Sequence, residues 1–384
     1  GGKTEAALIP VVDGILKGGF SGVAALYLAP LKALINDQED RFSSFCLPTG
    51  LEVMKWHGDV PKGDRAWKDN EPPHILMITP ESLEVLLMER ELSLGLANLR
   101  YLIIDELHAF VESERGVQMR VLIDRLDRIS GRKIQRIGLS ATVGNPEEIL
   151  SWLSGSRHGE VLVRIPSPPQ SKRFTFVVEE KESARASAIA RIVRGKKALV
   201  FVNSRSEAEA VNTALASRVD HLLVHHSSLS PEMRRETERA FSESESSCII
   251  CTSTLELGID IGNLDVVVCI GPPPSVSSFL QRMGRSGRRG KPPYVACILK
   301  DACELLCMVA VIESASRKEV EPLHPPKKPY NVLVQQVLLE IVRKRRTSWS
   351  HIRRFVRGLF AFRGIKPREI DALLGVLDDS GILV

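Results

Sequence analysis

Two adjacent carboxylates at the end of a mostly apolar run are the residues of this chain that most directly indicate chemistry. The run covers residues 99–104, and Asp105 and Glu106 follow it without a break. A buried strand would place Asp105 at its carboxyl end, where a carboxylate can hold a hydrated magnesium ion. Glu106 would then orient and deprotonate an attacking water. The competing interpretation is an ordinary acidic pair at the end of a strand.

A glycine-containing segment at the start of the chain, Gly1-Gly2-Lys3-Thr4, matches the end of the phosphate-loop pattern G-x-x-x-x-G-K-[ST]. In such loops, backbone N–H groups and the start of the following helix hold phosphates. Lys3 would reach the β- and γ-phosphates of ATP, and Thr4 would bind magnesium together with Asp105. The segment is half a motif, so the prediction of an ATP and Mg²⁺ site depends on the acidic pair further along the same α/β segment.

Ser140-Ala141-Thr142 follows the next apolar run, residues 134–139. Beside the acidic pair we interpret this segment as a coupling element. The hydroxyls of Ser140 and Thr142 would hydrogen-bond the acidic motif and report the state of the nucleotide. The alternative is an N-cap for a helix that begins near Asn145.

Arginines spaced by glycines stand in the second half of the chain, in Gln281-Arg282-Met283-Gly284-Arg285-Ser286-Gly287-Arg288. Glycines let the backbone approach a partner closely. Arg285 and Arg288 would stabilise charge on a transferring γ-phosphoryl group, a contribution worth about a thousandfold or more in rate. A basic loop that binds nucleic acid is the alternative.

Short apolar runs alternate with helical patterns through the part of the chain that carries these motifs, as parallel βαβ architecture requires. A proline-rich connector, residues 166–172, separates two such sets. We therefore predict an α/β protein with two lobes, residues 1–165 and 173–320. The predicted strands are residues 23–28, 75–78, 99–104, 134–139, 198–202, 247–251, 266–270 and 294–299.

The C-terminal part has a different character, because a second proline cluster, residues 322–329, precedes three helical patterns. These cover residues 332–344, 349–359 and 367–379, with Ser348 predicted as an N-cap and Pro367 as the first residue of the last helix. Followed by a strand start at 381–384, they predict a small, mostly helical winged-helix domain over 321–384, with its wing missing.

Charge is concentrated in the same part. From residue 329 to residue 384 there are ten Lys and Arg against five Asp and Glu, so this part carries the whole net charge of +5. A basic terminal segment is the usual electrostatic footprint of phosphate binding. A solvated helical face is the alternative.

Composition excludes some classes of protein. The chain is 43% hydrophobic and 26% charged, which is typical of a globular protein, and it has no uncharged apolar run long enough for a membrane-spanning helix. Its seven cysteines lie mostly in apolar runs and indicate reduced thiols and a cytoplasmic location. Cys248 and Cys251 have no second Cys or His pair at the spacing of a zinc site.

In chain order, these motifs resemble the motif series of superfamily 2 helicases, from Gly2 to Arg288. Three further segments contribute to the resemblance: Pro30-Leu31-Lys32-Ala33-Leu34, Thr79-Pro80-Glu81-Ser82 and residues 252–260. Within the superfamily the chain is most similar to the Lhr-type (large helicase-related) group, through residues 29–34, 225–230, 255–262 and 281–287. Gln281 stands where DEAD-box RNA helicases have His.

The resemblance implies two RecA-like lobes, a winged helix, dependence on ATP and magnesium, and 3′→5′ movement along single strands. It implies that Asp260 faces the nucleotide sugar and Gln281 the γ-phosphate region. It also implies that His108 couples the ATP site to the nucleic-acid site and binds no metal. DNA repair is an expectation for the family. The residues implied in nucleic-acid contact are Pro30, Lys32, Thr79, Pro80, Asn203, Arg205 and Thr252.

Two features of the family are missing from the chain: an adenine-recognition motif before the phosphate loop and a further domain after the winged helix. We therefore expect a fragment that is truncated at both ends and incomplete at its nucleotide site.

The leading hypothesis is an ATP-driven helicase or translocase on single-stranded DNA. Aromatic residues make up 5% of the chain, which favours backbone contact over base stacking. One alternative is an ATPase that remodels RNA or DNA/RNA hybrids. Another is a nucleic-acid-binding scaffold that does not hydrolyse ATP. No membrane partner is expected, and the sequence predicts no particular oligomeric state.

Overall fold

The structure is a computed structural model that describes residues 2–58, 71–155, 159–164, 171–257, 262, 264–287 and 292–381. The chain divides into two compact units. Unit 1 comprises Gly1–Ser140, Asn145–Leu162 and Leu323–Val384, and unit 2 comprises Ala141–Gly144 and Val163–Pro322. The C-terminal helices therefore belong to the same unit as the first sheet.

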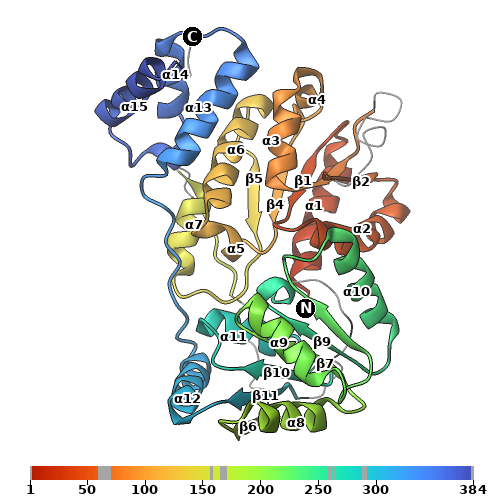
Figure 1. Cartoon of the computed structure of the whole chain (residues 1–384). Helices are drawn as coiled ribbons and strands as arrows, with labels where there is room; N and C mark the ends of the chain where they lie inside the picture. Colours follow the sequence, from red (N-terminus) through yellow and green to blue (C-terminus); the bar gives the residue numbers. More distant parts are fainter. Residues whose placement is uncertain are drawn as a thin grey trace. The chain divides into compact units, whose positions relative to one another are not determined.

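Unit 1 contains a five-stranded sheet of order β2-β3-β1-β4-β5 in which every neighbouring pair is parallel (Figure 1). The three inner strands are fully buried or nearly so and almost entirely aliphatic, as strands covered on both faces must be. The strands are β1 (Ala25–Leu28), β2 (Val53–Trp56), β3 (Ile75–Ile78), β4 (Tyr101–Ile104) and β5 (Gln135–Gly138). The helices around them are α1 (Lys3–Gly18), α2 (Lys32–Cys46), α3 (Pro80–Met88), α4 (Arg90–Leu94), α5 (His108–Val111), α6 (Glu114–Ser130) and α7 (Pro146–Ser154).

Parallel register brings the carboxyl ends of these strands to one edge of the sheet. Leu28 pairs with both Ile78 and Ile104, and Ile104 pairs with Gly138. The residues that follow each strand therefore emerge side by side, although they come from distant parts of the sequence. This edge carries every site residue that the sequence predicts after a strand of the first lobe.

Unit 2 contains a six-stranded sheet of order β6-β11-β10-β7-β9-β8, which is also parallel throughout. The strands are β6 (Arg173–Val178), β7 (Lys197–Phe201), β8 (Leu222–His225), β9 (Ser247–Cys251), β10 (Val266–Ile270) and β11 (Tyr294–Leu299). The helices are α8 (Glu182–Val193), α9 (Arg205–Leu215), α10 (Pro231–Glu243), α11 (Val276–Met283) and α12 (Ala302–Arg317). Its core combines the inner strands with apolar residues of α8 and α9.

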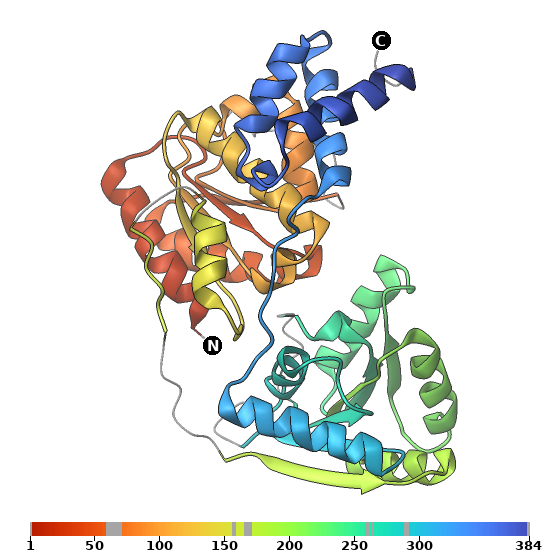
Figure 2. The ribbon, with the colours of Figure 1, turned by 90° about the vertical axis from the view of Figure 1, so that its left-hand side faces the viewer.

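Three helices follow an extended segment that leaves α12: α13 (Tyr330–Lys344), α14 (Trp349–Arg357) and α15 (Pro367–Asp379) (Figure 2). Ser348 caps α14 by accepting the His351 N–H at 3.2 Å, and Pro367 begins α15, as predicted. The helices share one apolar core with Val117 and Val121 of α6. They pack on the first lobe because α6 supplies part of that core.

The prediction of two parallel α/β lobes is confirmed. The sequence analysis missed β2, β6 and β8, and these are three of the four edge strands of the two sheets. Edge strands are half-covered, so they lack the continuous apolar runs by which the inner strands were found. Most of the predicted connector, residues 166–170, and the strand start at 382–384 lie outside the described residues.

No helix among the described residues is long and apolar enough to span a membrane. Five cysteines are buried and two, Cys303 and Cys307, are exposed. Burial raises the pKa of Cys248 to about 12, so this thiol in β9 stays protonated. The described residues contain no group of three potential metal ligands of the His, Cys, Asp and Glu types.

Candidate active site

Asp105 and Glu106 lie directly after β4, at the carboxyl edge of the first sheet. Asp105 is 7% exposed, and its Oδ1 accepts the Glu106 N–H at 2.9 Å. Glu106 has a positive φ of 47°, an uncommon conformation for a residue with a side chain. Two hydrogen bonds fix the backbone around Glu106. Its own N–H donates to the Asp105 carboxylate, and the N–H of Leu107 donates to the Leu139 carbonyl at 2.8 Å. The site therefore holds Glu106 in one orientation.

Tyr27, in β1, donates its hydroxyl to the other oxygen of Asp105. The tyrosine is fully buried. Burial raises the pKa of Asp105, and the charge of Glu106 adds to this, while the Tyr27 hydrogen bond and the charge of Lys3 oppose it. Burial, with Asp105 next to the hydroxyl, likewise raises the pKa of Tyr27 above its ordinary value. Tyr27 is therefore a fixed donor that orients the carboxylate.

Lys3 and Ser140 meet at the same edge, because the Lys3 Nζ donates to the Ser140 carbonyl oxygen at 3.0 Å. Gly2 precedes α1 with a φ of 89°, which a glycine adopts without strain. Thr4 lies in the first turn of α1 and is partly buried. The structure thus brings the lysine of the half phosphate loop to the segment after β5.

His108 links the acidic pair to Ser140. Its Nδ1 lies 3.5 Å from Glu106 Oε2 and 3.4 Å from Ser140 Oγ. Burial lowers the pKa of His108 to about 4, with Lys3 adding to the effect and Asp105 opposing it. The imidazole is therefore neutral near pH 7. Asn145, and neither Ser140 nor Thr142, is the N-cap residue of α7, and Thr142 is exposed in the short segment that belongs to unit 2.

The residues of unit 1 that are predicted to contact nucleic acid lie at the carboxyl ends of the neighbouring β-strands β1 and β3. Thr79 caps α3 by accepting the Ser82 N–H at 3.4 Å, and Pro80 is the first residue of that helix. Pro30 is buried after β1, and Lys32 is the first residue of α2. Arg115 joins the two loops, donating to the Pro30 carbonyl at 2.8 Å and to Glu81 at 2.6 Å.

In unit 2, a buried ion pair connects three of the predicted motifs. Arg282, 1% exposed, donates its Nε to Glu256 at 2.8 Å and an Nη to Asn203 Oδ1 at 3.2 Å. Asn203 also donates to the Pro272 carbonyl at 2.9 Å. Arg285 donates to the Glu256 backbone carbonyl at 2.8 Å. Glu256 is thus the hub that orients the arginine segment.

The remaining predicted residues of unit 2 occupy loops and helix ends. Arg205 is exposed at the first position of α9, and Thr252 is partly buried directly after β9. Gln281 lies in the last turn of α11. Asp260 and Arg288 lie outside the described residues.

Four polar residues next to the predicted motif residues of the two units have no predicted role in the sequence: Tyr27, Arg115, Glu256 and Arg282. Tyr27 is the one polar side chain in an otherwise aliphatic strand, and that exception is a usable signal. Glu256 and Arg282 lie inside the quoted motifs but were given no role of their own. Arg115 stands outside all motifs, and its two contacts are long-range in sequence.

Two family models match the chain. DEAD/DEAH box helicase matches residues 1–149, and Helicase conserved C-terminal domain matches residues 183–290. Together with the two parallel lobes and the motif residues at the strand ends, these matches place the chain in the superfamily 2 helicases.

Within that superfamily the chain is similar to helicases of the Lhr type. ATP-dependent helicase Lhr-Core of Methanothermobacter thermautotrophicus is 30% identical, with 98% of this chain and 48% of the relative covered. The protein of the same name from Methanocaldococcus jannaschii is 32% identical, with 88% and 43% covered. The chain spans about half the length of these relatives.

A solved structure supports the same assignment. Helicase Lhr of Mycobacterium smegmatis, bound to ssDNA and AMP-PNP, superposes with a TM-score of 0.81 at 29% identity. The similarity covers 98% of this chain and 52% of that chain. The fold comparison therefore includes the C-terminal helices as well as the two lobes.

Proposed function

We propose that this chain is the motor part of a DNA helicase, which hydrolyses ATP to ADP and phosphate and moves 3′→5′ along single-stranded DNA. The observation that carries the proposal is the cluster at the edge of the first sheet. It joins Lys3, Asp105, Glu106, His108 and Ser140 through contacts of 2.9 to 3.5 Å. A lysine for the phosphates, one carboxylate for magnesium and a second carboxylate for the attacking water are groups that enzymes use for phosphoryl transfer to water.

The division of labour follows from the contacts. Gly2, Lys3 and Thr4 would bind the phosphates of ATP, with Lys3 exchanging the Ser140 carbonyl for a phosphate oxygen. Glu106, held by its backbone, would orient the attacking water and take its proton. Neutral His108 would pass the state of Glu106 to Ser140, because it contacts both.

Magnesium fits the residues present. Asp105 has one hydrogen bond to Tyr27 and one to the Glu106 N–H among the described residues, so its oxygens keep lone pairs for a cation. Carboxylate and hydroxyl oxygens are the ligands that magnesium prefers. Asp105 and Thr4 would hold the ion, which neutralises phosphate charge when bound.

Unit 2 carries the arginine segment. We propose that Arg285 and Arg288 stabilise the charge of the transferring phosphoryl group, with Gln281 near the γ-phosphate and Asp260 at the nucleotide sugar. The support is the buried Glu256–Arg282 pair, which fixes the segment that carries Arg285. We further propose lobes at 1–165 and 173–320 joined by 166–172, a winged-helix domain at 321–384, and a cytoplasmic location.

Single-stranded DNA is the proposed nucleic-acid substrate because the structure of the M. smegmatis relative was solved with ssDNA bound. Pro30, Thr79 and Pro80 lie at strand ends bridged by Arg115, and Asn203 is held between Arg282 and Pro272. We propose that these residues, together with Lys32, Arg205 and Thr252, contact the strand backbone. Backbone contacts predict binding that tolerates any sequence and weakens with salt.

The test is the rate of ATP hydrolysis with and without single-stranded DNA. We expect DNA to raise the rate severalfold and Glu106→Gln to lower it by about a hundredfold or more, because the water loses its base. Glu52→Gln, which removes an exposed carboxylate of the same unit, is the matched control and should hydrolyse ATP normally. A rate that DNA does not change, or that survives Glu106→Gln, would contradict the proposal.

The same assay separates the alternatives. Stronger stimulation by RNA or by a DNA/RNA hybrid than by DNA would favour an ATPase that remodels those polymers. DNA binding with no hydrolysis under any condition would favour a non-hydrolysing scaffold.

A further inference from the structure

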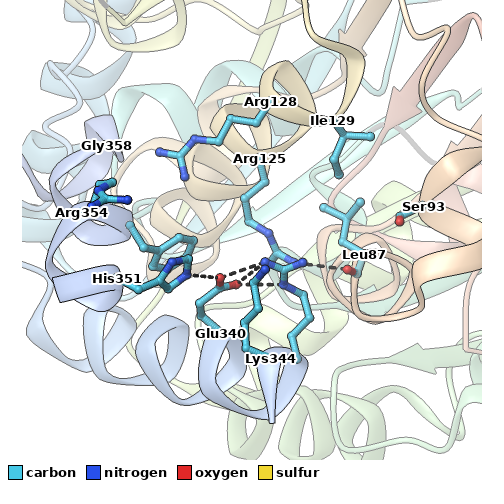
Figure 3. A pocket seen from close by; sticks show the side chains of 12 residues that line it. Leu87, Ser93, Arg125, Arg128, Ile129, Glu340, Lys344, His351, Arg354 and Gly358 are labelled. Atoms are coloured by element: carbon cyan, nitrogen blue, oxygen red, sulfur yellow. Dashed lines mark hydrogen bonds and ion pairs between the residues drawn. The ribbon is translucent and has the colours of Figure 1, made fainter. Parts of the chain in front are cut away.

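A pocket outside the proposed ATP site lies within unit 1, where the C-terminal helices meet the first lobe (Figure 3). Its volume is about 450 Å³. The walls come from the C-terminal half of α3, from α4 and α6, and from α13, α14 and Gly358. Leu87 of this wall lies near the opposite end of α3 from Thr79, which caps that helix. Thr79 and Leu87 lie roughly 12 Å apart along the helix axis. The pocket therefore lies about one helix length from the proposed nucleic-acid contact at Thr79.

The lining is strongly basic. It includes five Lys and Arg residues and one carboxylate, Glu340. The cations belong to three different helices, α6, α13 and α14, and Figure 3 shows side chains of all three arranged around one space. Positive charges from separate elements that converge on one concave surface repel one another unless an anion lies between them.

Two of the five cations already have counter-ions. Arg125 pairs with the buried Glu84, behind the pocket wall. Arg343 pairs with Glu340 through two hydrogen bonds of 2.8 Å. These two guanidinium groups add little net field because each is neutralised at contact distance.

Glu340 is already bonded to two side chains of the C-terminal helices, Arg343 and His351. Its side chain is 3% exposed, and it also accepts a hydrogen bond from His351 at 2.9 Å. Burial alone would raise the pKa of Glu340, but the bonds from Arg343 and His351 outweigh burial and hold the pKa below its ordinary value. The carboxylate is therefore ionised and bonded to two partners.

Three cations remain, Arg128, Lys344 and Arg354, and none has an acidic partner among the residues that the structure describes. Arg128 lies over the Phe355 ring at 5.8 Å, so its guanidinium is oriented by packing and keeps its donors. A compact oxyanion can accept hydrogen bonds from guanidinium and ammonium groups at once, and phosphate matches the fork of arginine.

We propose that this pocket binds phosphate, through Arg128, Lys344 and Arg354, at the junction of the first lobe with the C-terminal helices. The phosphate comes either from the backbone of a nucleic acid or from free inorganic phosphate groups. The nucleic-acid source rests on the proposed function, and the free-phosphate source does not.

The test compares two double variants of equal charge in a Lys3→Ala background, which removes the phosphate loop from the measurement. Lys344→Gln with Arg354→Gln removes two pocket cations. Arg346→Gln with Arg357→Gln removes two exposed cations of the same segment that do not line the pocket. The first readout is the rise in Tm caused by millimolar pyrophosphate. The second is the salt dependence of single-stranded DNA affinity, measured without ATP.

Loss of the pyrophosphate shift in the pocket variant alone, with an unchanged salt slope, supports the pocket and assigns it to free phosphate. A salt slope lower than the control's by about 0.7 per lost contact supports the pocket and assigns it to a backbone phosphate. Pocket and control variants that match in both readouts would overturn the proposal.

Two further observations guard against a purely structural effect. Without anion, the pocket variant should melt at or above the temperature of the parent, because removing surplus like charge relieves repulsion. Lys344→Arg with Arg354→Lys keeps the charge and should keep phosphate binding, and loss of binding there would contradict a role based on charge. Both readouts are independent of ATP hydrolysis, so an inactive ATPase would leave this result intact.

Discussion

Asp105 shows how one buried hydrogen bond orients a carboxylate at the sheet edge that we propose to be catalytic. The carboxylate comes from β4 and its orienting hydroxyl from Tyr27 in β1, a strand that pairs with β4 in register. The sequence places Asp105 because an apolar run ends at it. The sequence does not predict that Tyr27 orients Asp105, because this contact requires β1 and β4 to be neighbours in the sheet.

Tyr27→Phe should weaken the site without emptying the core, since the ring that packs against Phe42 at 4.9 Å is retained. Loss of one hydrogen bond to a buried charged group costs about 1–3 kcal/mol. We expect that loss of stability in metal-free protein, measured by denaturant unfolding. We also expect ATP hydrolysis to need more Mg²⁺. Tyr101→Phe, in the same sheet, is the control, and equal behaviour of the two variants would count against an orienting role.

His108 predicts a specific pH dependence of stability. Its pKa is about 4 in the folded protein and about 6.5 when unfolded. The unfolded chain therefore binds the extra proton first, and stability is lost as pH falls from about 6.5 to about 4. The loss from this group amounts to roughly 2–3 kcal/mol.

His108→Gln should reduce that loss, because glutamine does not titrate. Denaturant midpoints in metal-free buffer at pH 7.5 and pH 4.5 measure the effect, with the exposed His221→Gln as control. An unchanged difference between the two pH values in His108→Gln would show that His108 is not buried in its neutral form.

At the scale of elements, a buried network fixes the C-terminal helices to the first lobe. Glu84 of α3 is 5% exposed, pairs with Arg125 of α6 and accepts a 2.7 Å hydrogen bond from Gln336 of α13. Removing one partner of a buried ion pair leaves an uncompensated charge. The contacts that join α3, α6 and α13 therefore include one shared carboxylate, that of Glu84.

Glu84→Ala should lower the free energy of unfolding of unit 1 by about 3–5 kcal/mol. Glu81→Ala removes a carboxylate of the same helix whose side chain is 51% exposed and pairs with Arg115, so it should cost at most about 1 kcal/mol. Thermal melting of the two variants makes the comparison. Similar losses in both would mean that the Glu84 network does not hold the helices together.

Helices and strands that depend on nearby residues could be predicted from the sequence, and those that depend on distant residues could not. The inner strands, the N-cap of α14 and the first residue of α15 depend on local residues, and the sequence was sufficient for them. The edge strands β2, β6 and β8 depend on a neighbour that the sequence does not specify. The packing of α13 on α3 depends on Glu84 and Gln336, which are 252 residues apart in sequence.

At the scale of the whole molecule, each of the two α/β units carries part of the helicase motif series. Unit 1 holds Lys3, Asp105 and Glu106, and unit 2 holds Arg285. The C-terminal part carries the net positive charge of the chain, and it contributes most of the basic pocket. We therefore expect ATP hydrolysis by the α/β units to be accompanied by phosphate contacts in the C-terminal part.

The most direct test of this account is strand displacement from a short duplex with a single-stranded tail at one end. We predict displacement that requires ATP, occurs on a duplex with a 3′ tail, and is lost in Lys3→Ala, whose ammonium would no longer reach the phosphates. Displacement without ATP, or displacement that is equally fast from a 5′ tail, would contradict an ATP-driven motor that moves 3′→5′.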